Sequence, residues 1–228
     1  MKVVLASRNR GKLREIVPLL DGLGFELYTV DEIAPACELR EDGDTFEANA
    51  LAKARQAAAA TGLPAIADDS GLEVDALAGA PGVYSARYAG LPDVSSGTLE
   101  GSPNPPATGV GKQSSPDSHA IDARNNAKLL DALSGVPAPG RGARFRCVAA
   151  FVDPAAGVEL SRNGDCAGEI LEQPRGDLGF GYDPLFLVPR LGRTMAELPL
   201  DEKNRLSHRT AAFRALAHAL AARGGRSG

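Results

Sequence analysis

The sequence has few of the features that mark secreted, membrane or disulfide-stabilised proteins. Its 228 residues include three cysteines, which are widely spaced and form no CxxC pair. An odd number of isolated cysteines favours reduced thiols in a cytoplasmic protein. No stretch approaches the uninterrupted apolar run that a membrane span needs. The N-terminus enters a strand-like segment at once, without the apolar core of a secretory signal.

The chain also lacks an excess of positive charge. Its net charge is -4 at pH 7, whereas proteins that bind a nucleic-acid backbone usually carry a basic face. A small anionic ligand held by a few local lysines and arginines is compatible with this balance. With 43% hydrophobic and 24% charged residues, the composition is that of a soluble globular protein. The length suits one large α/β domain, or two lobes that share a core.

Hydrophobic periodicity in the N-terminal part predicts alternating strands and helices. Short apolar runs predict buried strands over 3–6 and near 25–30, with a helical pattern between them. A second helix is predicted to begin at Asp44, because Glu47 follows three residues later as in a capping box. Gly62 is predicted to end this helix.

One later segment breaks this pattern. From about 91 to 118 the chain is rich in Ser, Pro and Gly and has almost nothing to bury. We expect a surface loop or disorder there, as an insertion within a single domain that spans 1–224. Beyond it, strands are predicted over 144–152 and 157–166, joined by a hairpin turn, and Ser207 is predicted to cap the last helix.

Two adjacent carboxylates, Asp68 and Asp69, follow the short apolar run at 65–67, which predicts a buried strand that ends with them. Neighbouring like charges raise each other's pKa, so the pair needs a cation or a shared proton. Ligands bind at the carboxyl ends of strands in open α/β sheets, and Mg²⁺ prefers one or two carboxylates plus phosphate oxygens. The alternative interpretation is an Asp-rich turn or helix cap.

A polar loop with a lysine, residues 7–12, lies between the first predicted strand and helix. Helix N-termini present free N–H groups and a partial positive charge, which suit phosphate. Ser7 and Asn9 add donors and Lys12 adds a full charge, although the glycine spacing is not that of a Walker A loop. A simple helix cap is the alternative. Lys53, on an otherwise apolar helix face, either reaches an anion or extends to the rim.

Two further polar segments lie in the last quarter of the chain. Residues 179–183 place two aromatic side chains on a glycine-rich loop, which suits stacking on a planar base. Residues 207–209 contain Ser, His and Arg where the last helix is predicted to begin, so their donors are expected to face outward from its N-terminus. The alternative is a pair of packed aromatic residues and a capping serine.

Taken together, these segments resemble a known family. The motifs at 7–12, 42–50, 68–72, 180–184 and 207–209 are similar, in this order, to those of the inosine/xanthosine triphosphate pyrophosphatase family. Its members cleave purine nucleoside triphosphates with non-standard bases to the monophosphate and pyrophosphate. The resemblance spans nearly the whole chain, and the longer segment around 91–118 is its main departure.

The resemblance implies a two-lobed α/β fold around an elongated mixed β-sheet flanked by helices, with the active-site cleft between the lobes. It also implies a homodimer, Mg²⁺ as cofactor, and Asp69 as both proton acceptor and metal ligand. Glu41 is implied as the second metal carboxylate. The implied substrate-binding residues are Ser7, Arg8, Asn9, Arg10, Gly11, Lys12, Lys53, Ser70, Phe180, Gly181, Tyr182, Asp183, Lys203, His208 and Arg209.

The residues suggest a mechanism that agrees with this resemblance. A water activated by Asp69 or by Mg²⁺ would attack the α-phosphorus, and Asp68 would either share the metal sphere through water or orient Asp69. We therefore expect a cation and a water to lie between the two aspartates and the phosphate. Arg209 and His208 can donate hydrogen bonds, which favours a 6-oxo purine over adenine, as in ITP, dITP and XTP. The alternatives are a non-catalytic nucleotide-binding module and a phosphohydrolase that releases orthophosphate.

Overall fold

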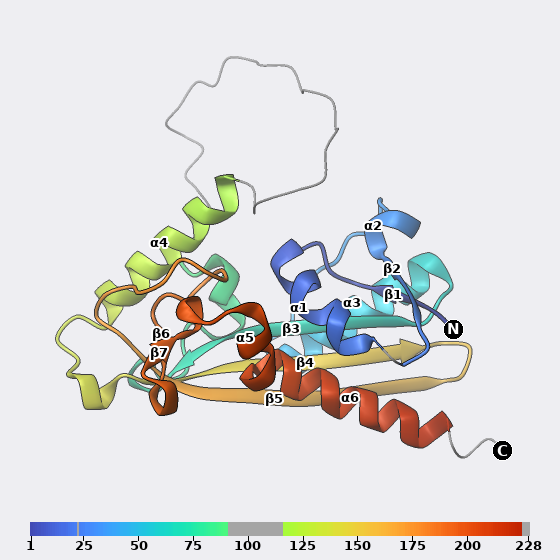
Figure 1. The fold of residues 1–228 in the computed structure, drawn as a ribbon. Helices are drawn as coiled ribbons and strands as arrows, with labels where there is room; N and C mark the ends of the chain where they lie inside the picture. Colours follow the sequence, from blue (N-terminus) through green and yellow to red (C-terminus); the bar gives the residue numbers. More distant parts are fainter. Residues whose placement is uncertain (22, 91–115, 225–228) are drawn as a thin grey trace, which may run out of the picture.

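The computed structural model describes residues 1–21, 23–90 and 116–224 and contains one mixed β-sheet (Figure 1). The seven strands lie in the spatial order β2 (Glu26–Thr29), β1 (Lys2–Leu5), β3 (Ala65–Val74), β4 (Gly142–Asp153), β5 (Val158–Ile170), β6 (Phe186–Val188) and β7 (Arg193–Thr194). β1 is parallel to β2 and β3, and the other neighbouring pairs are antiparallel. The predicted α/β fold with a mixed sheet is confirmed, as is the hairpin formed by β4 and β5.

Helices cover both faces of the sheet and divide the molecule into two lobes. The helices are α1 (Arg10–Leu20), α2 (Val30–Ile33), α3 (Phe46–Thr61), α4 (Pro116–Ala132), α5 (Leu200–Leu206) and α6 (His208–Gly224). In the first lobe α3 packs on one face of the sheet, whereas α1 and α6 pack on the other. In the second lobe α4 packs against the far ends of β3, β4 and β5 and against β6. The three long strands join the two lobes.

The boundaries of α3 show how local sequence shapes this fold. Thr45, not Asp44, is the N-cap, and its side chain accepts a hydrogen bond from the amide of Ala48. The predicted start of the helix was therefore one residue too early, because the adjacent threonine can also cap a helix. Gly62 ends the helix at φ 68°, in the left-handed region, as predicted.

The predicted end of β3 was wrong in a way that matters for the site. The strand does not stop at Asp69 but continues to Val74, paired with β4 along its whole length. β1 pairs with β3 only at its first two residues, Ala65 and Ile66. β1 therefore ends before it reaches Asp68 and Asp69. Beside these two residues the edge of β3 is unpaired, and it is open to a ligand at the carboxyl end of β1.

α4 was not predicted from the sequence. Its first three residues, 116–118, belong to the segment that was expected to lack structure, so that expectation was wrong for them. The rest of that segment, 91–115, lies outside the described residues. Leu129 of α4, and Leu133 directly after its end, anchor the helix in the second lobe's core. Within the described ranges, none of the helices is both long and apolar enough to cross a lipid bilayer.

Candidate active site

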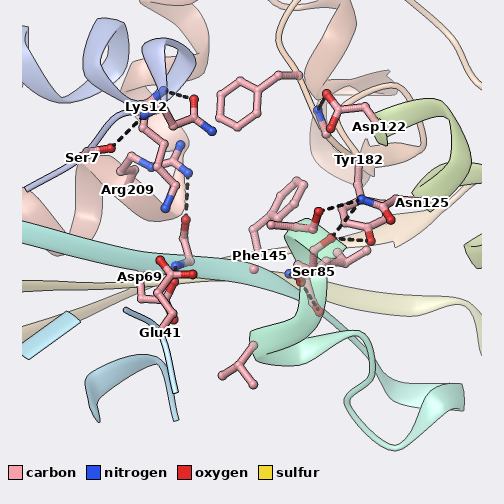
Figure 2. A pocket seen from close by; sticks show the side chains of 18 of the residues that line it. Ser7, Lys12, Glu41, Asp69, Ser85, Asp122, Asn125, Phe145, Tyr182 and Arg209 are labelled. Atoms are coloured by element: carbon pink, nitrogen blue, oxygen red, sulfur yellow. Dashed lines mark hydrogen bonds between the residues drawn. The ribbon is translucent and has the colours of Figure 1, made fainter. Parts of the chain in front are cut away.

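A cavity of about 480 Å³ lies between the lobes at the open edge of β3 (Figure 2). Both lobes contribute, for example through Lys12 and Lys53 from the first and Tyr182 from the second. The predicted site residues that line it are Ser7, Arg8, Asn9, Lys12, Glu41, Lys53, Asp69, Ser70, Phe180, Gly181, Tyr182, Asp183, Lys203, His208 and Arg209. Arg10 and Gly11 line an adjoining cavity of about 630 Å³.

Asp68 and Asp69 point to opposite faces of β3. Successive side chains of a strand alternate between its faces, and β3 continues through both aspartates. Figure 2 shows Asp69 on one side of the strand and Lys12 and Arg209 on the other. The two carboxylates therefore do not face one common position. Their separation across the backbone is what allows them to be neighbours.

On the α3 face, Asp69 forms a compact polar cluster with α3 and with Glu41. Asn49 donates a hydrogen bond to Asp69 Oδ2 at 3.0 Å, and the Lys53 ammonium lies 3.6 Å from Asp69 Oδ1. Lys53 also forms an ion pair with Glu41. Burial raises the pKa of Asp69, and the nearby lysines offset it only in part. For Glu41 burial acts in the same direction, but the contact with Lys53 outweighs it and lowers the pKa.

On the opposite face, Asp68 is surrounded by donors and cations. Its Oδ2 atom lies 3.1 Å from the Lys12 ammonium and 3.5 Å from Arg209 Nε, and it accepts a hydrogen bond from the Ser70 hydroxyl. Asp68 is only 1% exposed. Burial alone would raise its pKa, but Lys12 and Arg209 outweigh burial and hold the pKa well below its usual range. Asp68 is therefore a permanently ionised anchor for these cations.

The N-terminus of α1 arranges part of the predicted phosphate loop. The Asn9 side chain caps the helix by accepting a hydrogen bond from the Lys12 backbone amide at 3.1 Å. The backbone amide of Asn9 donates to Ser7 Oγ at 3.3 Å. Arg8 is engaged elsewhere, because its guanidinium pairs with Asp31 at 2.7 Å and donates to the Cys37 carbonyl at 2.8 Å. Arg8 thus ties the loop to the segment that follows α2, although it also lines the cavity.

Phe180 is the aromatic side chain of the glycine-rich loop that is placed to meet a base. The Lys203 ammonium lies 5.0 Å and the Arg209 guanidinium carbon 5.6 Å from its ring centroid, within cation–π range. A Cβ atom on Gly11 would lie 2.8 Å from this ring, so a glycine is needed where α1 and the loop touch. Tyr182, by contrast, is buried and donates to the Ser85 carbonyl at 2.9 Å, which matches the packing alternative.

The sequence analysis did not identify Glu15, which organises the cations at this end of the cavity. It pairs with Arg209 and, at 2.7 Å, with Lys203, while Lys203 also lies 2.6 Å from Asp183. Burial opposes the charge on Glu15, but Arg209 and Lys203 outweigh it and lower its pKa. Of these two cations, Asp183 contacts Lys203 alone, and burial, with the nearby charge of Glu15, outweighs this contact and raises its pKa. The only sequence signal for Glu15 is its position one helical turn after Lys12.

His208 is buried as a neutral side chain. Its ring stacks on Phe145, with 4.9 Å between centroids and 19° between planes. Burial, with Arg209 and Lys203 nearby, lowers its pKa well below the usual range. Its Nδ1 atom has no hydrogen-bond partner among the described residues. Other lining residues that the sequence analysis missed are Ser85, Asp122, Asn125 and Phe145.

The carboxylates on the α3 face suit a divalent cation that arrives with a phosphate ligand. No cluster of three or more potential metal ligands is found in the described parts of the chain. Glu41 and Asp69 both contact the Lys53 ammonium, so they converge on a position that already attracts a cation. Two carboxylates plus substrate phosphate oxygens are a ligand set typical of Mg²⁺. These two residues therefore fit the implied metal.

Comparison with known proteins agrees with this geometry. The model of the Ham1 family matches residues 3–219. The dITP/XTP pyrophosphatase of Geobacter sulfurreducens is 50% identical over 208 residues, 91% of this chain and 90% of that protein. The dITP/XTP pyrophosphatase of Methylococcus capsulatus is 49% identical over 222 residues, 97% of this chain and 96% of that protein. A HAM1 protein structure from Coxiella burnetii is 40% identical with a TM-score of 0.77, covering 97% of this chain and 98% of that chain. These matches confirm the resemblance seen in the motifs: the chain belongs to the Ham1 family.

Proposed function

We propose that the chain is a Mg²⁺-dependent nucleoside-triphosphate pyrophosphatase that converts ITP, dITP and XTP to the monophosphate and pyrophosphate, and so cleanses the nucleotide pool. One observation carries this proposal. A single cavity holds the cluster of Asp69, Glu41 and Lys53, suited to a metal and phosphates, and the cation-flanked ring of Phe180, suited to a base. The similarity to proteins that are named dITP/XTP pyrophosphatases supports it.

The side chains around Asp69 define how the hydrolysis would proceed. The oxygen of a water held by Asp69 bonds to the α-phosphorus while the bond from this phosphorus to the bridging oxygen breaks. The electron pair leaves with pyrophosphate, and the water's proton moves to the Asp69 carboxylate. Asn49 orients that carboxylate through its hydrogen bond. Lys12 and Lys53 stabilise the charge on the phosphates, and Mg²⁺ held by Glu41 and Asp69 would polarise the phosphate oxygens.

Selectivity for the base follows from the donors beside Phe180. Arg209 already donates to Asp68, Glu15 and Ser70 through three of its N–H groups, whereas a guanidinium has five and accepts none. Its remaining donors suit the 6-oxo group of hypoxanthine or xanthine and do not suit the amino group of adenine. We expect weak turnover of ATP for this reason.

Product analysis with the purified protein, Mg²⁺ and ITP, beside ATP and GTP, tests the proposal. We expect IMP and pyrophosphate from ITP, with slow turnover of ATP and GTP. IDP and orthophosphate would move the attack to another phosphorus and support a different phosphohydrolase. Binding of ITP without turnover would mean a nucleotide-binding module and would refute the catalytic role of Asp69.

We infer further, from the family resemblance, a homodimer in the cytoplasm with neither nucleic acid nor membrane as partner. The three cysteines are free thiols, which suits a reducing compartment. Light scattering coupled to size-exclusion chromatography measures the mass in solution, and a monomer at micromolar concentration would contradict the dimer.

A further inference from the structure

One polar face of α4 is directed at the cavity and has no role in the mechanism above. Asp122, Asn125 and Asn126 are three and four residues apart, so they share a side of the helix. Asp122 and Asn125 line the cavity. In Figure 2 they lie on the second-lobe side, away from Asp69 and Glu41.

Asp122 and Asn126 hold both backbone polar groups of Gly181. The Gly181 amide donates to Asp122 Oδ2 at 2.8 Å, and Asn126 Nδ2 donates to the Gly181 carbonyl at 3.0 Å. α4 thus binds the glycine-rich loop directly next to Phe180, the residue whose ring faces Lys203 and Arg209.

The loop needs such contacts to adopt one conformation. Gly179 and Gly181, on either side of Phe180, have φ values of 79° and 62°, in the region that favours glycine. Glycine loses more conformational freedom on ordering than any other residue. Within the loop, the Phe180 amide donates to Asp183 Oδ2 at 2.9 Å. From outside, Lys203 and Ser85 contact the side chains of Asp183 and Tyr182, and α4 supplies the contacts to the backbone of Gly181.

α4 is itself held rigidly, so it can position the loop. Asn125 accepts a hydrogen bond from the Ala89 amide at 2.8 Å and donates to the carbonyls of Ser85 and Ala86 at 3.3 and 3.2 Å. Leu129 of α4, and Leu133 directly after its end, are fully buried in the core of the second lobe. A side chain mounted on a well-packed helix holds its partner more accurately than one on a loop.

We propose that Asp122 and Asn126 are positioning residues that keep Phe180 in place as a preformed platform for the purine. The inference rests on the proposed base-binding role of Phe180. Without the clamp the loop must be ordered when substrate binds, which weakens binding. The groups around Asp69 remain unchanged, so KM rises while kcat is retained.

Steady-state kinetics with ITP test this clamp. Asp122→Leu removes the acceptor for the Gly181 amide, and we expect KM to rise about tenfold with kcat within about twofold. Asn126→Leu should act in the same direction. Asp122→Asn keeps a carbonyl acceptor and should retain the wild-type KM, and so should Arg124→Leu, a control on the exposed side of α4. An unchanged KM in both folded leucine variants, or a fall in kcat alone, overturns the clamp.

A second measurement reports loop order without substrate. The chain has no tryptophan, so Phe180→Trp introduces a single tryptophan, whose fluorescence can be excited selectively. Acrylamide should quench this fluorescence more strongly when Asp122→Leu is added, and no more strongly when Asp122→Asn is added. Equal quenching in all three proteins contradicts the proposal.

The KM of Phe180→Ala separates the base-binding role of Phe180 from the clamp formed by Asp122 and Asn126. If Phe180→Ala leaves KM unchanged, the base-binding role of Phe180 fails; if it raises KM and Asp122→Leu does not, only the clamp fails.

Discussion

The two faces of β3 at the cavity carry adjacent aspartates in contrasting surroundings. Asp68 faces α1 and α6, where Lys12 and Arg209 hold its pKa well below the usual range despite burial. Asp69 faces α3, where burial dominates over Lys53 and raises its pKa. Residue type is the same on both faces, so the difference lies in how many cations each carboxylate meets. Asp68 holds cationic side chains in place, and the surroundings of Asp69 suit the role of proton acceptor and metal ligand that we propose for it.

The largest expected effect is loss of catalysis on the Asp69 face. Asp69→Asn should lower kcat for ITP by about 10³-fold, because the amide neither accepts the water's proton nor provides a full charge for Mg²⁺. Its stability should be close to that of wild type or slightly higher, because burial disfavours the Asp69 charge. A rapid-quench assay with urea unfolding in parallel measures both. An Asp69→Asn variant with the kcat of wild type would contradict the assignment of catalysis to the Asp69 face.

Loss of stability is the corresponding expectation on the Asp68 face. Asp68→Asn leaves Lys12 and Arg209 without their shared anion, and removing one partner of a buried ion pair costs about 3 kcal/mol. We expect the free energy of unfolding to fall by that amount in urea denaturation. If instead Asp68→Asn is as stable as wild type and as inactive as Asp69→Asn, the two faces do not differ as described.

The dependence of activity on Mg²⁺ tests whether the Asp69 face holds the metal. Chelation by EDTA should abolish turnover, and added Mg²⁺ should restore it. Glu41→Gln should raise the Mg²⁺ concentration for half-maximal activity by about tenfold, because one of the two carboxylates loses its charge. Glu38→Gln is a matched control, since Glu38 pairs with Arg40 on the surface. Equal Mg²⁺ requirements in both variants would remove Glu41 from the metal site.

The smallest expected effect concerns His208, which lies on the Asp68 face. Its folded pKa is well below 6.5, so the unfolded chain binds the proton first as the pH falls. The stabilising contribution is therefore complete above pH 6.5 and declines below it. Between pH 7.5 and 5.0, wild type should lose about 1 kcal/mol more of its unfolding free energy than His208→Gln. Parallel losses, measured in urea at both pH values, would show that His208 titrates normally.

Features that depend on local sequence were predictable. The polar loop before α1, the glycine stop of α3 and the β4–β5 hairpin follow from residues within a few positions of one another. Each motif that indicated the family is likewise a short run of neighbouring residues. The start of α3 was misplaced by one residue, because Asp44 and Thr45 can both cap a helix and the general preference for Asp did not decide between them.

Features that depend on contacts between distant segments were not predictable. Glu15 pairs with Lys203 and Arg209, almost the whole chain away, and only folding brings α1 beside α5 and α6. The contacts of α4 with Gly181 and Ser85 likewise cross large sequence distances. Arg8 lines the cavity, as expected for a substrate-binding residue, but its ion pair with Asp31 could not be predicted from the sequence.

The amino-acid sequence by itself determined which chemical groups are available: a capped helix with a lysine, a carboxylate pair, a second lysine on α3, and an aromatic loop followed by a histidine and an arginine. How Asp68 and Asp69 divide their roles follows from the tertiary structure alone. That division depends on β3 continuing past Asp69 to Val74 with β4 as its partner. Strand alternation then sends the two side chains to opposite faces, where helices that are remote in sequence supply different numbers of cations.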